Sequence, residues 1–403
     1  MRNRVLIAGA GPAGLCLAAY LTEANIPVCI FEAEACLPKN LRASTFHPPT
    51  LDFLELFGAS KVLIDQGLIA PTFQYRDRKN GCLAEFDFDL ISNETNHPFR
   101  VQCEQFKLNL YLLDWLYDQG VKDIYFEHKI KNIEQNGDSV TVVADTPNGD
   151  RSYIGNWLIG ADGANSIVRQ LAGINFEGFT WEERFLVVST TYDYKKYIKN
   201  LSYVNYYADP QQWFFLLKVP GLWRVMFPVQ KEENEADIFG AECVENRMQW
   251  VQASPKTFEI AHRTLYKVHQ RVAAKYREGR IFLIGDAAHI NNPLGGMGMN
   301  GGIHDAFNLA EKISLFWHNQ KNSSVLDLYE KQRRPIALEY VNKQSIKNKQ
   351  NLEANTLEAQ EAFRVFLSEL MEDQSRAREY MMRVSMISSL REARRNDYFS
   401  NRS

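Results

Sequence analysis

The sequence has few cysteines, and their spacing does not suggest a metal or disulfide site. Its 403 residues include six cysteines, no two of which are spaced as C-x-x-C, and no histidine cluster accompanies them. Scattered cysteines are typical of reduced thiols in the cytosol, whereas small secreted domains carry dense, paired ones. We therefore expect a cytoplasmic protein with no metal.

The sequence also lacks an excess of positive charge and a long apolar run. Lysine and arginine number 46 against 49 acidic residues, which gives a net charge of −3 and no basic footprint for nucleic acid. No apolar run approaches the roughly 20 residues of a membrane span, and the N-terminal apolar stretch is interrupted by glycine and proline. With no repeat or low-complexity tract either, we expect ordinary globular domains.

Glycine is concentrated in two loops, and the first lies near the N-terminus. The stretch RVLIAGAGPAGLCLAAYLTEANIPVCIFEAE predicts a strand, a helix and a second strand. Gly9 permits the tight turn, Gly11 lets the backbone approach a pyrophosphate, and Gly14 lets helix and strand pack closely. Glu32 ends the second strand, where it would accept a hydrogen bond from a ribose hydroxyl. The unit predicts a dinucleotide site, with the anion at the helix N-terminus.

The second loop is GDAAHINNPLGGMGMNGG, residues 285–302, after the apolar strand IFLI. It contains another G-x-G-x-x-G match, but a seven-residue loop separates that match from the strand and no acid-tipped strand follows at the right distance. We interpret Asp286 as an acceptor for ligand hydroxyls and the glycines as backbone lying against a flat ligand. A helix beginning near Asn300 would favour an isoalloxazine ring that gains negative charge on reduction.

The rest of the chain alternates helices and strands. We expect helices within residues 41–69 and over FKLNLYLLDWLYDQG, strands within 72–98, and hairpin turns at the two NGD sequences, 136–138 and 148–150. Strand-forming residues from 184 to 230 predict one antiparallel sheet, followed by a helix around 240–250. Residues 323–395 predict a charged helical tail, which would pack on the protein or form a homodimer face.

Three motifs together resemble a known family. GAGPAG, GADGANSIVR and GDAAHINNPLGGMGMNGGIHDAFNLAEKI are similar, in the same order, to the signatures of the group A flavoprotein monooxygenases, the FAD-dependent aromatic hydroxylases related to p-hydroxybenzoate hydroxylase. The resemblance covers roughly residues 1–345. It implies an α/β (α+β) fold in which a Rossmann-like FAD-binding domain (1–72, 99–180 and 265–345) is interleaved with an antiparallel-sheet substrate domain (73–98 and 181–264). Residues 346–403 would form a helical C-terminal segment.

The resemblance also implies which residues hold FAD. Arg42 would reach the pyrophosphate side, Gln102 the ribityl chain, and Asp162 with Gly163 both FAD and the nicotinamide. Arg169 would be either structural or directed at an anion, and His289 would hold the loop. The full set of expected cofactor-binding residues is Gly9, Gly11, Ala13, Gly14, Glu32, Arg42, Gln102, Asp162, Asp286, Gly295, Gly298, Met299 and Asn300.

The mechanism that the resemblance implies is hydroxylation of a small aromatic or heteroaromatic substrate. NADH or NADPH, bound transiently, would reduce FAD, and a C4a-hydroperoxide formed with O2 would transfer oxygen to the ring. His47 would deprotonate or orient a phenol, and Pro293 and Gly298 would shape the space for oxygen chemistry. The substrate pocket is expected to include Tyr207, Trp213, Phe215, Arg224 and Met226. Strand alternation predicts that Trp213 and Phe215 share one face and that Arg224 and Met226 share another.

Other functions on the same scaffold stay open from the sequence. A flavin-dependent halogenase would carry a W-x-W-x-I-P segment, and WFFLLKVPGLW lacks that spacing. An isoprenoid-type reductase or oxidase, and a flavin-binding regulatory protein that uses its helical tail, are the remaining alternatives.

Overall fold

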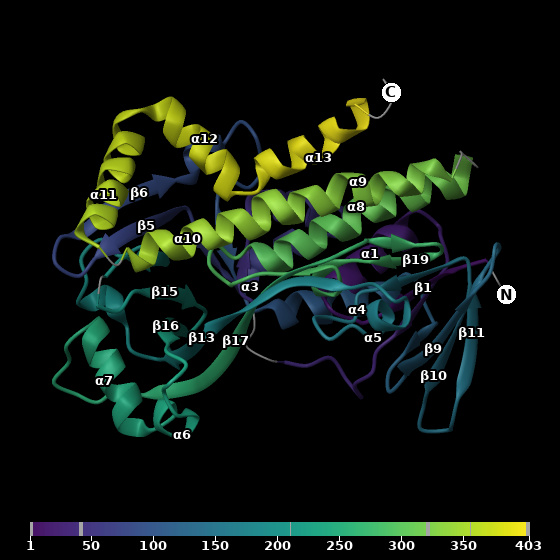
Figure 1. Ribbon diagram of the computed structural model, residues 1–403, viewed down its shortest axis with the longest axis horizontal. Coiled ribbons are helices and arrows are strands. Elements are labelled where there is room, and N and C mark those ends of the chain that lie inside the picture. Colours follow the sequence, from purple (N-terminus) through teal and green to yellow (C-terminus); the bar gives the residue numbers. More distant parts are fainter. Residues whose placement is uncertain (1–2, 40–42, 210, 320–322, 355, 400–403) are drawn as a thin grey trace.

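The computed structural model describes residues 3–39, 43–209, 211–319, 323–354 and 356–399 (Figure 1). The expected FAD-binding residue Arg42 lies outside these ranges. Among the described residues, no helix is both long enough and apolar enough to cross a membrane.

The N-terminal glycine loop belongs to a six-stranded sheet of order β18-β19-β12-β1-β2-β8. Apart from the antiparallel β18–β19 pair, neighbouring strands run parallel. The predicted strand–helix–strand unit is confirmed as β1, α1 and β2. The bounds are β1 (Val5–Ala8), α1 (Pro12–Glu23), β2 (Val28–Phe31), β8 (Ile124–Tyr125), β12 (Trp157–Gly160), β18 (Arg277–Glu278) and β19 (Ile281–Leu283).

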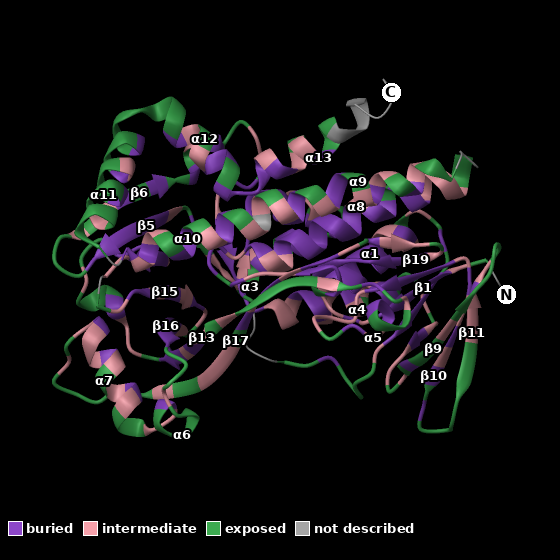
Figure 2. Ribbon diagram, viewed as in Figure 1, coloured by how far each residue is buried: buried purple, intermediate pink, exposed green. Residues whose placement is uncertain are grey.

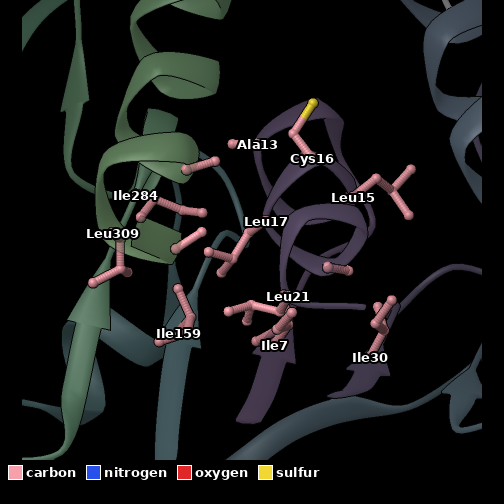
Figure 3. Packing of buried hydrophobic residues seen from close by; sticks show 14 of the residues in the cluster. Ile7, Ala13, Leu15, Cys16, Leu17, Leu21, Ile30, Ile159, Ile284 and Leu309 are labelled. Atoms are coloured by element: carbon pink, nitrogen blue, oxygen red, sulfur yellow. The ribbon is translucent and has the colours of Figure 1, made fainter. Parts of the chain in front are cut away.

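Helices cover one face of this sheet and a small β-sheet covers the other. Figure 3 shows Leu17 and Leu21 of α1 packed between Ile7 of the sheet and Leu309 of α8. On the other face, a side chain on Gly155 would lie 2.7 Å from Leu6 Cγ, so β11 packs directly on β1. The two NGD turns are confirmed as the links of the β11-β10-β9 sheet. The bounds are α4 (Gln105–Asp118), β9 (Lys129–Gln135), β10 (Val140–Asp145), β11 (Arg151–Gly155), α5 (Ile167–Leu171) and α8 (Met297–Asn319).

The second large sheet has eight strands in the order β20-β17-β13-β16-β15-β14-β5-β6. It contains the predicted antiparallel strands, but β14 and β5 pair in parallel. The expected domain boundaries at 180/181 and 264/265 fall inside the long strands β13 and β17, which therefore join the two halves. The bounds are β5 (Thr72–Asp77), β6 (Gly81–Asp87), β13 (Phe176–Thr190), β14 (Val204–Tyr207), β15 (Phe214–Val219), β16 (Leu222–Val229), α6 (Glu235–Ile238), α7 (Ala241–Val251), β17 (Ile260–Ala273) and β20 (His289–Ile290).

A small antiparallel sheet, β3-β7-β4, leads into the substrate-domain sheet, since β4 is separated from β5 by a single residue, Pro71. Two helices follow β3 and confirm the helical prediction for this part of the chain. The bounds are β3 (Thr45–Phe46), α2 (Pro48–Leu54), α3 (Ala59–Gln66), β4 (Leu68–Ala70) and β7 (Arg100–Gln102).

The C-terminal helices wrap back over the molecule. In Figure 1, α9 runs along α8, and α11 and α12 lie against the β5–β6 hairpin. Leu367 and Met381 are buried in the same core as Phe73 and Phe86 of that hairpin, so the segment is part of the substrate-domain core (Figure 2). The expected boundary at 345/346 falls inside α10. The bounds are α9 (Ser324–Ile336), a π-helical turn (Ala337–Asn342), α10 (Lys343–Glu353), α11 (Leu357–Glu372), α12 (Gln374–Val384) and α13 (Ile387–Phe399).

Candidate functional site

Glycine stands at three positions of the first loop, and the structural reason differs from one position to the next. Gly9 has φ +102°, and a side chain there would lie 2.7 Å from the carbonyl carbon of Ala161. A Cβ on Gly14 would collide with the carbonyl oxygen of Gly9. Gly11 has φ −76°, and an added Cβ would meet no described atom within 4 Å. The fold therefore requires Gly9 and Gly14, while Gly11 opens onto space in front of α1, whose N-terminus has no side-chain cap.

Glu32 and Ala13 lie beside this turn. The half-buried Glu32 carboxylate accepts a hydrogen bond from Ala10 N at 2.9 Å, which fixes it next to the glycine loop. The Ala13 methyl group would be 3.1 Å from a Cβ on Gly285. The start of α1 therefore contacts the beginning of the second glycine stretch, and the two loops lie together although they are about 270 residues apart.

The GADG motif lies beside the two glycine loops. Asp162 accepts from the Ser166 hydroxyl at 2.5 Å and from Val168 N at 3.1 Å. Burial raises the pKa of this carboxyl, and the hydrogen bonds from Ser166 and Val168 oppose that rise. Arg169 donates to the carbonyl oxygens of Ala287 (2.9 Å) and Ala164 (2.8 Å), so it is structural and ties this motif to the second glycine stretch.

The turn that carries Asp286 is held in place by a network of buried hydrogen bonds. Asp286 is exposed among buried neighbours, at the carboxyl end of β19. Underneath it, the buried Asp305 carboxylate accepts from Gly285 N (3.2 Å) and from His289 Nε2 (2.8 Å), while Arg333 Nε donates to Asp305 at 2.7 Å. His289 therefore holds the loop, as expected. Burial alone would raise the pKa of Asp305, but the charge of Arg333 and the hydrogen bonds from His289 and Arg333 bring it below its ordinary value.

The middle of the second loop is fixed to β3. Gly295 and Gly296 have φ of +98° and +67°, which favours glycine at both positions. The Asn300 carboxamide accepts from His47 N at 2.9 Å and donates to the carbonyl oxygens of Thr45 (2.8 Å) and Gly296 (2.6 Å). The Asn300 side chain thus joins the loop to β3.

Helix α8 begins at Met297, three residues before the expected start near Asn300. A Cβ on Gly302 would lie 2.9 Å from Gly285 Cα, and one on Gly301 would lie 3.2 Å from His289 Cε1. These two glycines therefore allow α8 to pack on the Asp286 turn, which corrects the expectation that all the glycines face a ligand. Gly298 would bring a Cβ to 3.2 Å from Asn291 Oδ1.

The remaining expected loop residues differ in exposure. Pro293 is exposed, and Met299 is half-buried against the core of the first sheet. Leu294, which the sequence analysis did not single out, is fully buried in the core of the substrate domain. The loop therefore bridges the two cores.

Gln102 is fully buried on β7 beside β3. Its Oε1 accepts from the Thr45 hydroxyl at 2.9 Å, but its Nε2 has no hydrogen-bond partner among the described residues. A buried amide donor without a partner is uncommon, because losing its hydration costs about 1–3 kcal/mol. This donor fits a ligand hydroxyl or carbonyl.

The strand register decides which expected substrate residues share a face. Phe215 pairs with Met226, and Leu217 pairs with Arg224, so the aromatic and basic residues lie on one face rather than on two. Trp213 joins the same core, but Tyr207 packs in the core on the opposite face. Tyr206 takes its place, because it is paired with Phe215. The Arg224 Nη1 donates to Ser44 Oγ at 3.1 Å, so this face meets the start of β3.

His47 lies where the loop, β3 and this face meet. It is fully buried, and its Nε2 lies 2.8 Å from the carbonyl oxygen of Gly295. A carbonyl only accepts, so Nε2 carries the proton and Nδ1 holds a lone pair; Nδ1 has no partner among the described residues. Burial, followed by the nearby charge of Arg100, holds the pKa of His47 well below its ordinary range, so the ring is neutral at pH 7.

Arg100 is a residue of this site that the sequence analysis missed. It is two residues before Gln102 on β7, it is 2% exposed, and its guanidinium lies over the rings of Phe73 and Phe88. The sequence signal was the position of Arg100 in a short strand next to Val101 and Gln102, which are both buried. An arginine is seldom fully buried unless it is paired, so a buried arginine points to a partner.

Comparison with known proteins adds the relatives of this chain. A family model described as "FAD binding domain" matches residues 2–344. The chain is 32% identical over 341 residues to the para-nitrophenol 4-monooxygenase of Pseudomonas sp. strain WBC-3, covering 83% of this chain and 84% of that protein. It is 30% identical over 355 residues to the 6-hydroxy-3-succinoylpyridine 3-monooxygenase HspB of Pseudomonas putida, covering 87% and 89%. The crystal structure of p-nitrophenol 4-monooxygenase PnpA from Pseudomonas putida DLL-E4 matches with a TM-score of 0.90 at 28% identity, over 96% of this chain and 98% of that one.

Proposed function

This chain belongs to the FAD-dependent aromatic hydroxylases of the group A flavoprotein monooxygenase type, and from that premise we propose that it hydroxylates a small phenol or hydroxylated heteroaromatic ring, with NAD(P)H and O2 as co-substrates. The fold class, the FAD cofactor and the monooxygenase activity expected from the sequence are confirmed. The substrate class, NAD(P)H and O2 are our proposals, supported by the two bacterial relatives that act on a nitrophenol and on a hydroxypyridine.

One observation carries the proposal: the second glycine loop reaches into an aromatic core. Leu294 of that loop is buried together with Tyr206 and Met226 of the sheet. A flat cofactor held along the loop would therefore have an apolar, aromatic surface opposite it, which suits a substrate ring and excludes water.

The residues of the two loops fit an elongated dinucleotide. Among the described residues, nothing occupies the space in front of Gly11 and no side chain caps α1, which suits a pyrophosphate. The Gln102 Nε2, which has no partner among those residues, and the exposed Asp286 suit hydroxyls along the chain. We propose that Glu32 binds the ribose, and that Asp162, Gly295, Gly298, Met299 and Asn300 line the cofactor with Arg42. FAD, when bound, supplies two-electron transfer from the nicotinamide and activation of O2.

We propose that His47 orients the substrate and does not act as a charged group. Its neutral ring keeps the Nε2 proton on the Gly295 carbonyl, which leaves Nδ1 as an acceptor. A ring hydroxyl or ring N–H that keeps its proton would donate it to Nδ1, which would orient the substrate. Among the expected catalytic residues, Gly298 and Pro293 would shape the loop next to this position.

We further propose that the enzyme works in the cytoplasm, where NAD(P)H is available, and that a homodimer would form through α11. That helix exposes three large apolar side chains, and the mass of the protein in solution tests the dimer. The three residues are Leu357, Val365 and Met371.

The test is a substrate screen with the purified protein. We expect a yellow protein whose NAD(P)H and O2 consumption rises when a suitable phenol or hydroxypyridine is added, with hydroxylated product formed. Aminobenzoates and quinolones belong in the same panel, and peroxide is quantified to separate hydroxylation from idle oxidation. A yellow protein that no ring compound stimulates, with either nicotinamide, would contradict the proposal and favour a regulatory flavin-binding role.

A further inference from the structure

Arg100 is a buried cation for which the described part of the chain supplies no anion. Its side chain is 2% exposed, and neither Nε nor Nη1 has a hydrogen-bond partner among the described residues. Burying a charge without a partner is expensive, so buried arginines are normally paired with carboxylates. The Arg169 guanidinium, for comparison, donates to two carbonyl oxygens.

The surroundings of Arg100 are aromatic. The Arg100 Cζ lies 4.8 Å from the ring centroid of Phe73 and 5.3 Å from that of Phe88. Rings stabilise a guanidinium through its face, but they do not accept its in-plane N–H groups. Those groups form a planar fork that matches an oxygen anion, and the described residues around Arg100 supply no such anion.

The position of Arg100 connects it to the loop and to the proposed substrate surface. Its backbone is two residues from Gln102, and its charge acts on His47, whose Nε2 lies on the Gly295 carbonyl. Phe73 and Phe88 belong to the same core as Leu294 of the glycine loop. The Arg100 guanidinium therefore lies against the core that the glycine loop enters, where we place the substrate ring.

Two tyrosines add hydroxyl groups near the same charge. Tyr75 of β5 and Tyr380 of α12 are joined by a hydrogen bond of 3.0 Å between their hydroxyl oxygens. That bond uses one of the two protons, so the other can be donated to a ligand. Burial raises the pKa of Tyr380 to about 12, while Arg100 acts in the opposite direction, so the hydroxyl stays protonated at neutral pH. The C-terminal segment thereby brings a polar group close to Arg100.

We propose that Arg100 binds an anionic oxygen of the aromatic substrate, a phenolate or a ring carboxylate, with the Tyr75–Tyr380 hydroxyl pair as a second donor. The inference rests on the proposed function, and it defines the substrate class further: the enzyme takes its ring as an anion. A phenolate is also the more electron-rich form of a phenol, so a guanidinium that selects it favours oxygen transfer to the ring.

The test compares ligands in which one oxygen can or cannot ionise. Affinities of 4-nitrophenol and its methyl ether, 4-nitroanisole, are measured by the change in flavin absorbance, for the wild type and for Arg100→Gln. The variant should bind 4-nitrophenol about 10- to 150-fold more weakly, the range for a charged hydrogen bond, and 4-nitroanisole almost unchanged. The colour of bound 4-nitrophenol gives a second readout, because the wild type should hold it as the coloured phenolate at a pH where the free phenol is protonated.

A second pair of ligands locates the anion. 4-Hydroxybenzoate and its methyl ester differ in the carboxylate, so a loss confined to 4-hydroxybenzoate assigns Arg100 to a ring carboxylate, and a loss confined to 4-nitrophenol assigns it to the phenolate. Both support anion recognition. Arg100→Lys keeps the charge and should recover most of the affinity. Tyr380→Phe should weaken the same ligand by a smaller factor.

Arg76→Gln is the matched control, since Arg76 is a buried arginine next to Tyr207 on the opposite face and its Nη1 donates to Gln74 at 2.6 Å. It should leave both affinities unchanged in protein that retains FAD. The proposal is overturned if Arg100→Gln retains FAD and binds both members of each pair as the wild type does, or weakens charged and neutral ligands equally. A wild type that binds the anions but consumes no NAD(P)H with them would instead contradict the proposed function.

Discussion

Gly11 is a glycine that the fold itself does not require. Its φ of −76° suits any residue, and an added Cβ meets no described atom within 4 Å, so we infer that the glycine leaves room for a ligand. We expect Gly11→Val to fold and to lose FAD, because its methyl groups would occupy the space of the pyrophosphate. The absorbance ratio of flavin to protein after purification measures this, together with the melting temperature of the apoprotein.

Gly137 offers a control for that experiment. It also has no described atom within 4 Å of an added Cβ, but it lies in the exposed turn between β9 and β10. Gly137→Val should keep its FAD. If Gly11→Val were as yellow as the control, the first glycine loop would not be at the pyrophosphate.

His304 is a buried neutral histidine that couples stability to pH. Burial, followed by the charge of Arg333, lowers the pKa of His304 to about 3 from an ordinary value of 6.5. The unfolded chain therefore binds a proton that the folded chain refuses, and the stability that this residue contributes is complete above pH 6.5 and lost as the pH falls toward 3. The expected slope is about 1.4 kcal/mol per pH unit within that window.

Replacing His304 should remove one proton from the pH dependence. Denaturant unfolding of His304→Gln between pH 6.5 and 4.5 should show a slope smaller than the wild type by that amount. Thr50→Val removes the hydrogen bond of 2.9 Å to His304 but keeps the buried ring, so the wild-type slope should persist. An unchanged slope in His304→Gln would mean that this ring is protonated in the folded protein.

Helix α8 is held on the Asp286 turn by the ion pair of Asp305 and Arg333, in which both side chains are 1–2% exposed. Asp305→Asn leaves the Arg333 charge buried and unpaired, so we expect unfolding to become easier by about 3–5 kcal/mol and the affinity for FAD to fall with the displaced turn. Urea unfolding and flavin titration measure the two effects.

A surface ion pair provides the comparison for Asp305. Asp327 pairs with Arg277 at 2.5 Å, but its side chain is 53% exposed, so Asp327→Asn should cost about 1 kcal/mol or less. Equal losses in the two variants would show that the buried pair does not hold the helix.

Several elements were predictable because local sequence determines them. The strand–helix–strand unit at residues 5–31 follows from glycine spacing and an apolar run, and the NGD turns follow from backbone preferences. The start of α8 was misplaced by three residues, because Gly298, Gly301 and Gly302 disfavour a helix locally while packing against Gly285 and the Asp305 network stabilise one. Tertiary contacts of that kind are invisible in a single sequence.

The substrate side was less predictable, because it is assembled from distant strands. Alternation along one strand gives its two faces, but the register between β15 and β16 decides that Arg224 shares a face with Leu217. The two-residue turn Pro220-Gly221 sets that register, and the sequence analysis did not use this turn. Arg100 was missed for a related reason. Its guanidinium lies over Phe73 and Phe88, and the sequence does not show that these two rings lie beside β7.

At the scale of the whole molecule, the C-terminal helices pack on the substrate-domain sheet and contribute side chains to its core. Leu367 of α11 is 1% exposed, so Leu367→Ala should destabilise the protein by about 2–5 kcal/mol. Glu361 lies on the same helix and is exposed, so Glu361→Ala should change the free energy of unfolding by no more than about 0.5 kcal/mol. Thermal or urea unfolding compares them, and a neutral Leu367→Ala would show that the C-terminal segment is a separable tail.

The central claim is that this protein inserts one oxygen atom from O2 into an aromatic ring. The direct measurement is a reaction under ¹⁸O2 with NAD(P)H and the most active ring compound of the screen, followed by mass spectrometry of the product. The account predicts one ¹⁸O atom in each hydroxylated product, with one NAD(P)H consumed for each product formed. Product that carries oxygen from water, or NAD(P)H oxidation that yields only hydrogen peroxide with every ring compound tested, would contradict it.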